Sequence, residues 1–301
     1  MDARRRTRAA VAVVVAVLAL ALVIGMPGSR DTADADGRTA VVASFFPLAD
    51  AAEHIGGHHV VVRNLTPPGT EPHDLELSTR SVDEIDRAEL AIVLGDDFQP
   101  AVEDAADRRN GVTLVALDVA GGDLRADDPH VWLDPARMLD IVDAVARRLA
   151  RVDPEHARTY RARAERYATT LRALDGEYRN GLAHCSRRVL VTSHDAFGYL
   201  ADAFHLEERS VSGLSPDAEP DARKLGELAD LARRDGVTTV FSEEMVSPRV
   251  ARTVAREAGG LRVTTLNPLE GLSAREQRAG ADYVSVMRAN LRTLRRALGC
   301  V

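Results

Sequence analysis

The sequence predicts an α/β protein with two lobes, each a roughly four-stranded, mainly parallel sheet flanked by helices, joined by one long rigid helix. Short apolar and β-branched runs alternate with helical patterns along the chain, as is typical of parallel strands connected by helices. The alternation occurs twice, with about four strands in each half. Between the halves lies one helical pattern over residues 154–183, which is long for a globular protein.

The first half begins with a short apolar run and a helical pattern that ends at Gly56-Gly57, because glycine favours the end of a helix. Ser78 is placed to cap a second helix, since a serine oxygen can accept a hydrogen bond from a free amide at a helix start. The expected strands of this half are 40–44, 58–65, 90–94 and 112–117, and the expected helices are 47–57, 78–87 and 100–108.

Helical patterns over 135–151 and 154–183 follow, and the second has apolar residues at intervals of three and four, as in an amphipathic helix. In the second half the expected strands are 189–192, 206–211, 238–241 and 262–266, and the expected helices are 197–204, 221–235, 248–258 and 273–298. We therefore expect an N-terminal lobe over 39–150, a long linking helix over 151–184 and a C-terminal lobe over 185–301.

Residues 1–38 are interpreted as a signal peptide or N-terminal anchor plus a flexible linker. A basic segment, Arg4–Arg8, precedes an apolar run from Ala9 to Met26, which just reaches the length of a membrane span. We favour a cleaved signal peptide, and an uncleaved anchor is the alternative. No cysteine follows the run, so we expect no lipidation site there. Either reading places the body of the protein outside the cytoplasm.

The charge of the chain argues against a nucleic-acid partner. The net charge is −7, although residues 1–30 hold five arginines and one aspartate and are therefore basic. The rest of the chain is more acidic still, which opposes binding to phosphate backbones and is compatible with a cation as ligand.

The chain has two cysteines, Cys185 and Cys300. Outside the cytoplasm, two thiols predict one disulfide, which would hold the C-terminal helix beside the first strand of the second half. The alternative is two unpaired thiols. The two are too far apart in sequence to form a CxxC motif, so cysteine ligation of a metal is not expected.

Three histidines and one glutamate lie in loops of the predicted sheets. They are His73 in PPGTEPHD, His130 in DPHVWLDP, His194 in VTSHDA and Glu270 in LNPLEGL. His73, His194 and Glu270 follow the carboxyl ends of predicted strands, where α/β sheets bind ligands, and His130 follows a longer connection. We expect two ligands from each half and therefore a metal site in the cleft between the lobes.

Three imidazoles and one carboxylate suit Zn²⁺ in tetrahedral geometry, whereas Mn²⁺ sites usually contain more oxygen. The chain has no HExxH motif and no GxSxG motif, so a zinc hydrolase is disfavoured. We interpret Trp132 as core support beside His130, and His54, His58 and His59 as surface or capping residues. Glu243 and Glu244 are most simply solvated, with a place lining the cleft as the alternative.

Four stretches carry a resemblance to a known family: PPGTEPHDLELSTR, DPHVWLDP, TSHDAFGYLA and LNPLEGL. With them, residues 41–300 resemble the metal-binding proteins of ABC-type zinc and manganese importers, the ZnuA/AdcA/TroA-like group. The resemblance implies that His73, His130 and His194 are metal ligands. Histidine at the third of these positions is typical of the zinc-type branch.

The resemblance leaves the fourth ligand open. Asn267 stands where some members have a ligating aspartate, so we assign Glu270, with Asn267 or water as the alternative. The segment 121–128 also departs from many zinc-type members, which have a histidine-rich loop there.

The resemblance implies a binding protein and not an enzyme. We expect a monomeric, extracytoplasmic protein that captures Zn²⁺, with Mn²⁺ possible, and delivers it to an ABC importer permease. The alternatives are a manganese or broad-specificity metal-binding protein or adhesin of the same fold and, less favoured, a zinc hydrolase.

Overall fold

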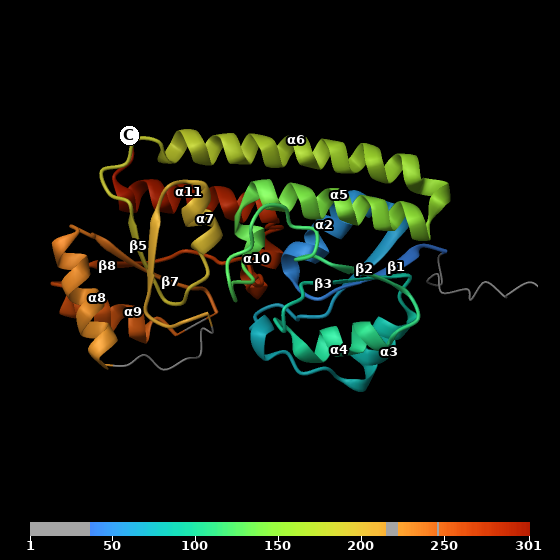
Figure 1. The fold of residues 1–301 in the computed structure, drawn as a ribbon, viewed down its shortest axis with the longest axis horizontal. Coiled ribbons are helices and arrows are strands. Elements are labelled where there is room, and N and C mark those ends of the chain that lie inside the picture. The colour runs from blue at the N-terminus through green and yellow to red at the C-terminus, as the bar shows by residue number, and fades with distance from the viewer. Residues whose placement is uncertain (1–36, 215–221, 246) are drawn as a thin grey trace, which may run out of the picture. The chain divides into compact units, whose positions relative to one another are not determined.

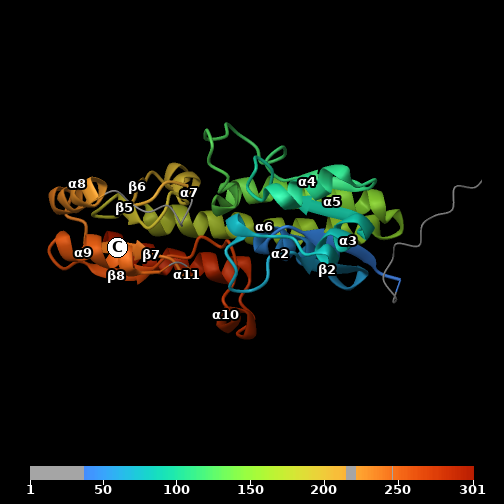
Figure 2. The ribbon, with the colours of Figure 1, turned by 90° about the horizontal axis from the view of Figure 1, so that it is seen from below.

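The computed structural model of the chain describes residues 37–214, 222–245 and 247–301. The predicted signal peptide or anchor lies outside the described residues. The region Ala33–Val301 forms one compact unit. Within it, two parallel sheets with their helices lie at opposite ends of a long helix (Figures 1 and 2), so the predicted fold class is confirmed. The predicted boundaries of the two lobes and of the linking helix stay a prediction.

The first sheet has the order β2-β1-β3-β4, and every neighbouring pair is parallel. Its strands are β1 (Thr39–Ala43), β2 (Val60–Asn64), β3 (Leu90–Val93) and β4 (Val112–Val115). Its helices are α2 (Phe46–Gly56), α3 (Thr79–Arg87) and α4 (Pro100–Arg108), with short 3-10 turns η1 (Gly57–His59) and η2 (Pro72–Asp74). The Ser78 side chain accepts a hydrogen bond from the Ser81 amide and so caps α3, as the sequence predicts.

The second sheet repeats this arrangement in the order β6-β5-β7-β8, again with all neighbours parallel. Its strands are β5 (Val189–Thr192), β6 (Glu207–Ser210), β7 (Thr239–Ser242) and β8 (Arg262–Thr265). Helices α7 (Gly198–Ala203), α8 (Ala222–Arg234) and α9 (Arg249–Glu257) accompany it.

Four helices pack together on the shared hydrophobic core. Helix α6 (Ala157–Leu182) packs against α2, against α5 (Pro135–Val152) and against α11 (Tyr283–Leu298). The turns η3 (Val131–Leu133) and η4 (Pro154–His156) precede α5 and α6. The largest hydrophobic core lies beneath these helices and includes residues of both sheets, so the two lobes share one core.

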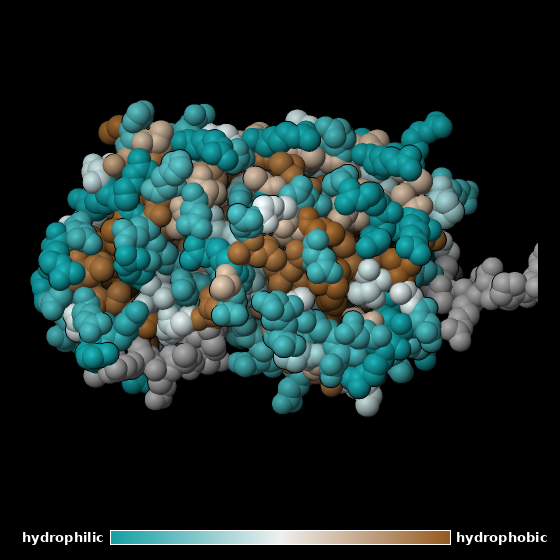
Figure 3. Space-filling view, viewed as in Figure 1, coloured by the Kyte–Doolittle hydropathy of each residue, from teal (hydrophilic) through white to brown (hydrophobic). Residues whose placement is uncertain are grey.

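The outer faces of the sheets have separate, smaller cores. In β3, Leu90 and Ile92 belong to the shared core, whereas Ala91 and Val93 face a core covered by α3 and α4. This division follows from the alternation of side chains along a strand. In the second sheet, Val191 and Val240 face a core under α8 and α9. Figure 3 shows mostly hydrophilic residues on the visible face, with hydrophobic residues gathered between α5 and α4.

The expected C-terminal helix over 273–298 is instead two helices, α10 (Ala274–Arg278) and α11. Gly280 has φ +69°, a left-handed conformation that ends α10. Asp282 then caps α11 in a reciprocal pair with Ser285. The prediction of one helix was wrong because it relied on the apolar spacing and did not take account of the helix end at Gly280 and the new N-cap at Asp282. Helix α10 stands out from the body in Figure 2.

The predicted disulfide between Cys185 and Cys300 is present, and it joins residues 115 positions apart. It ties the start of the second lobe to the end of α11. Across 37–214, 222–245 and 247–301, none of the helices combines the length and apolar character that a bilayer-spanning helix needs.

Candidate metal centre

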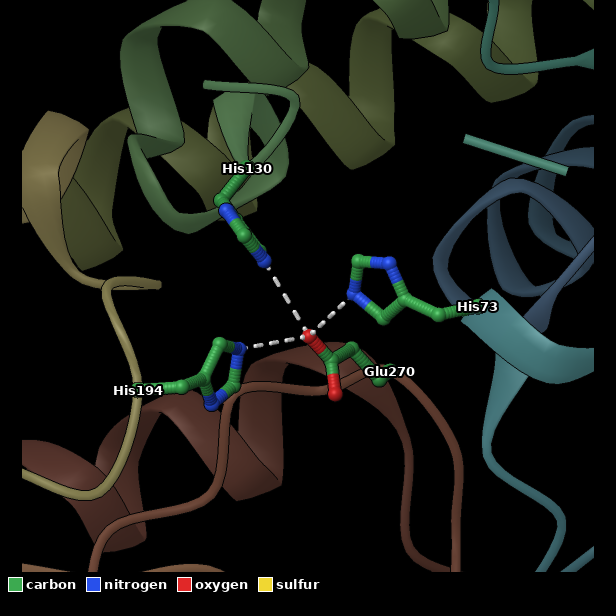
Figure 4. Close-up of side chains that lie close together, drawn as sticks. All are labelled: His73, His130, His194 and Glu270. Atoms are coloured by element: carbon green, nitrogen blue, oxygen red, sulfur yellow. Dashed lines mark hydrogen bonds and ion pairs between the residues drawn. The ribbon is translucent and has the colours of Figure 1, made fainter. Parts of the chain in front are cut away.

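The four predicted ligands come from four separate loops and meet at one point (Figure 4). His73 lies in η2, after β2, and His194 follows β5. Glu270 follows β8, and His130 lies directly before η3, after the long connection from β4. The strands of each sheet are parallel, so their carboxyl ends share an edge, and the two edges face each other across the site.

The donor atoms of the site surround one carboxylate oxygen. Oε1 of Glu270 lies 3.1 Å from Nε2 of His194, 3.2 Å from that of His130 and 3.4 Å from that of His73. All four donor atoms lie within 4.8 Å of one another. Three nitrogens and one oxygen at this spacing match in type and number the donors that tetrahedral zinc takes.

Three of the four side chains are buried. His130 and His194 are 0% exposed and Glu270 is 1% exposed, whereas the side chain of His73 is 16% exposed. Although Nε2 of His73 is buried, it has no hydrogen-bond partner. A buried, unpartnered donor aimed at three others is consistent with a ligand that completes a coordination shell.

Asp128 holds His130 from outside the site. Its Oδ1 accepts hydrogen bonds from the backbone amide and from Nδ1 of His130, at 3.0 and 2.8 Å. Because Nδ1 donates to a carboxylate, the lone pair of Nε2 is free to face the site. The motif DPH therefore supplies both a predicted ligand and the carboxylate that orients it.

Glu243 has the same role beside His194. Its Oε2 lies 2.7 Å from Nδ1 of His194, and its Oε1 accepts a hydrogen bond from the backbone amide of that residue. Glu243 is buried against His194, so its interpretation as a solvated residue was wrong, and the alternative, a place lining the cleft, fits it better. Glu244 is exposed. Glu243 follows β7 directly, and β7 is the parallel neighbour of the strand that precedes His194, which brings the two side chains together.

Asn267 shapes the loop that presents Glu270. Its Oδ1 accepts from the amide of Leu269, and its Nδ2 donates to Glu276. Asn290 binds both the amide and the carbonyl of Asn267. Leu269 has φ +59°, an uncommon conformation for leucine that this set of bonds sustains. With both ends of its amide engaged in the loop, Asn267 is not among the converging donors.

Trp132 joins the His130 loop to the Glu270 loop. The tryptophan is fully buried, with its ring centroid 5.1 Å from that of His130, which agrees with the predicted support role. Its indole Nε1 donates to the carbonyl of Pro268 at 2.8 Å. The ring of Phe98 packs against both Trp132 and His73, with centroid distances of 5.6 and 4.5 Å. These rings form an apolar wall behind the donors.

Burial and the attraction between opposite charges shift the pKa values of the site residues in opposite directions. Burial raises the pKa of Glu270, but the imidazoles around it outweigh this and hold the pKa well below its usual range. Burial lowers the pKa values of His130 and His194, but their carboxylate partners outweigh this and raise both. The arrangement therefore favours protons on the imidazoles, which a metal ion would have to displace.

Glu71 lies beside the ligands and was not singled out from the sequence. Both of its carboxylate oxygens are buried without a hydrogen-bond partner. Burial, and next the charge of Glu270, raise its pKa to about 9. Its place two residues before His73, within the loop, was the available signal.

The other histidines considered from the sequence lie outside this group. His54 is half-buried rather than on the surface: it stacks on Tyr167 with ring centroids 4.3 Å apart, and its hydrogen bond to Asp50 raises its pKa to about 9. The ring of His59 stacks on that of His156, with centroids 3.8 Å apart, and lies tilted against that of His58 at 3.9 Å. Within the described parts of the chain, the one cluster with converging metal donors is that of His73, His130, His194 and Glu270.

Comparisons with known proteins match this picture. A protein family described as "Zinc-uptake complex component A periplasmic" (ZnuA) matches residues 41–297. The zinc-binding protein AdcA of Streptococcus pyogenes is 35% identical over 290 residues, which cover 87% of this chain and 56% of AdcA. The chain thus spans about half the length of AdcA. The high-affinity zinc uptake system protein ZnuA of Bacillus subtilis is 30% identical, with 91% and 92% covered.

Solved structures show the same fold. The Zn(II)-bound ZnuA-like domain of Streptococcus pneumoniae AdcA is 33% identical with a TM-score of 0.75, and the match covers 87% of this chain and 99% of that domain. The periplasmic zinc-binding protein TroA of Treponema pallidum is 26% identical with a TM-score of 0.79, and the match covers 87% of this chain and 99% of TroA.

Proposed function

Because the chain belongs to the ZnuA family of periplasmic zinc-uptake components, we propose that it captures Zn²⁺ outside the cytoplasm and delivers it to an ABC-type permease. In this proposal His73, His130, His194 and Glu270 bind the ion, and the ion is cargo. The observation that carries the proposal is the convergence of the four donors in a buried site between two lobes.

The donor set favours zinc over manganese. Three neutral imidazole nitrogens and one carboxylate oxygen match the ligands and number that tetrahedral Zn²⁺ takes. Mn²⁺ generally occupies sites with more oxygen donors. The carboxylates of Asp128 and Glu243 lie behind histidines, on Nδ1, and so serve as outer partners in the proposal.

Capture and delivery also fit the site better than catalysis. A catalytic zinc keeps a position open for water, whereas here four protein donors supply a full tetrahedral set. Imidazole and carboxylate ligands can also release the ion again, because protons compete for them. We therefore propose a binding protein without enzymatic activity, which acts as a monomer at the outer face of the membrane.

A competitive titration with Zn²⁺ and Mn²⁺, with elemental analysis, tests the proposal. We expect one tightly bound zinc per chain, weaker binding of Mn²⁺ and a strong loss of zinc affinity in His194→Ala. The control is His184→Ala, because His184 is an exposed histidine outside the group of converging donors. Unchanged zinc binding in His194→Ala would contradict the ligand set. Equal affinity for the two metals would indicate a broad-specificity carrier instead.

A further inference from the structure

We propose that Arg125 is a positioning residue that holds the His130 side of the metal site against the His194 side and so slows metal release. The inference rests on the proposed function, because it concerns the retention of the ion at that site. Arg125 lies in the connection between β4 and η3 and contacts both the outer partner of one ligand and the helix that follows another.

The first contact of Arg125 is with Asp128. One oxygen of this buried carboxylate, Oδ1, holds His130, as described above. The other oxygen, Oδ2, lies 3.0 Å from Nε of Arg125. Asp128 is therefore held between the ligand and the guanidinium, and a displacement of Arg125 reaches His130 through one side chain.

The other contacts of Arg125 are with α7 in the C-terminal lobe. Nη1 of Arg125 lies 2.7 Å from Oδ2 of Asp202, and the backbone amide of Arg125 donates to the hydroxyl of Tyr199 at 2.8 Å. A Cβ on Gly198 would lie 2.7 Å from both Arg125 Nε and Asp128 Oδ2. The first residue of α7 thus approaches the ion pair more closely than any residue with a side chain could.

These contacts connect two ligands that belong to different lobes. Helix α7 begins four residues after His194, and the rings of His130 and His194 have their centroids 5.3 Å apart. When Arg125 is in place, the segment before His130 and the helix after His194 cannot separate without breaking an ion pair. These contacts of Arg125 therefore oppose the opening that lets the ion leave.

The test measures the rate of zinc release into excess chelator by stopped flow. Asp202→Asn removes the C-terminal-lobe partner without touching Asp128, and we expect about two- to five-fold faster release, as befits an exposed ion pair. Arg125→Ala also frees Asp128, and we expect about 10- to 100-fold faster release. Arg125→Lys should lie between them, because an ammonium cannot span both carboxylates as a guanidinium does.

The matched control is Asp143→Asn. Asp143 pairs with Arg147 within α5, and its side chain is 67% exposed, against 64% for Asp202. We expect this variant to release zinc at the wild-type rate. The melting temperature of the metal-free protein should also be unchanged in Asp202→Asn, which separates positioning from a general loss of stability.

Wild-type release rates in both Asp202→Asn and Arg125→Ala would overturn the inference. Equal acceleration in Asp143→Asn would also overturn it, because it would show a general effect of surface charge. A wild-type protein that binds no zinc would overturn the proposed function, and the two failures are thus distinguishable.

Discussion

The indole Nε1 of Trp132 donates a hydrogen bond of 2.8 Å to the carbonyl oxygen of Pro268. Trp132 lies two residues after His130, and Pro268 lies two residues before Glu270. One buried bond therefore fixes the spacing between two loops that carry proposed ligands from different lobes.

Replacement of Trp132 by phenylalanine should weaken both the fold and the site. The variant keeps an aromatic ring but leaves the buried carbonyl of Pro268 without its donor, at a cost of about 1–3 kcal/mol in the free energy of unfolding. We also expect weaker zinc binding, because the Glu270 loop loses an anchor. Denaturant unfolding and zinc titration measure the two effects, and wild-type values in both would show that the bond is dispensable.

Glu243→Gln should lower zinc affinity by about 10- to 100-fold, the usual effect of losing the carboxylate partner of a ligating histidine. Glutamine keeps the size of the side chain but not the charge beside Nδ1 of His194. The adjacent Glu244→Gln is the control, since Glu244 is exposed and should leave the affinity unchanged. Competition with a zinc-binding dye compares the variants. Similar affinities for the two variants would count against the role of Glu243.

A pair of substitutions separates Glu270 from Asn267 as the fourth ligand. Glu270→Gln should lower zinc affinity more than the outer-partner variants do, because a ligand itself is lost. Asn267→Asp should keep one zinc per chain and lower the free energy of unfolding, since a carboxylate would face Glu276 in place of a donor. Elemental analysis and denaturant unfolding give the two results. Tighter zinc binding in Asn267→Asp would instead point to position 267 as a ligand.

The stability gained from zinc should increase with pH. The raised pKa values of His130 and His194 stabilise the metal-free fold below about pH 6.5, and this contribution is lost as the pH rises through the folded-state values. Zinc displaces those protons, so it competes better at higher pH. We expect the rise in Tm on adding zinc to grow from about pH 6 to about pH 8. Thermal unfolding with zinc and with chelator measures it, and a rise that shrank with pH would contradict the assignment.

Glu270 affects the metal-free protein at the opposite end of the pH scale. Its pKa is held well below the usual range, so its contribution is present above the unfolded value and is lost only as the pH falls through the lower folded value. We expect the metal-free Glu270→Gln variant to differ least from wild type in Tm under strongly acidic conditions. A difference that was largest there would contradict the charge assignment.

The sequence predicted the fold because alternation of strands and helices is a local signal that is repeated along the chain. The loops of His73, His194 and Glu270 could be placed at the carboxyl ends of strands for the same reason. The contact of Glu243 with His194 was not predicted because it depends on β7 lying beside β5, and local pattern does not give the order of strands. The break before Asp282 was a different case, since Gly280 and the Asp282–Ser285 spacing were visible in the sequence.

The disulfide between Cys185 and Cys300 makes a covalent ring of the C-terminal lobe. His194 and Glu270 lie inside the ring, whereas His73 and His130 lie on the chain that leads into it. A protease that cuts once between the two cysteines therefore yields pieces that stay bonded to each other and to the first lobe. Such a nicked molecule would keep its full mass on a non-reducing gel and would separate into fragments only after its sulfur bridge had been reduced.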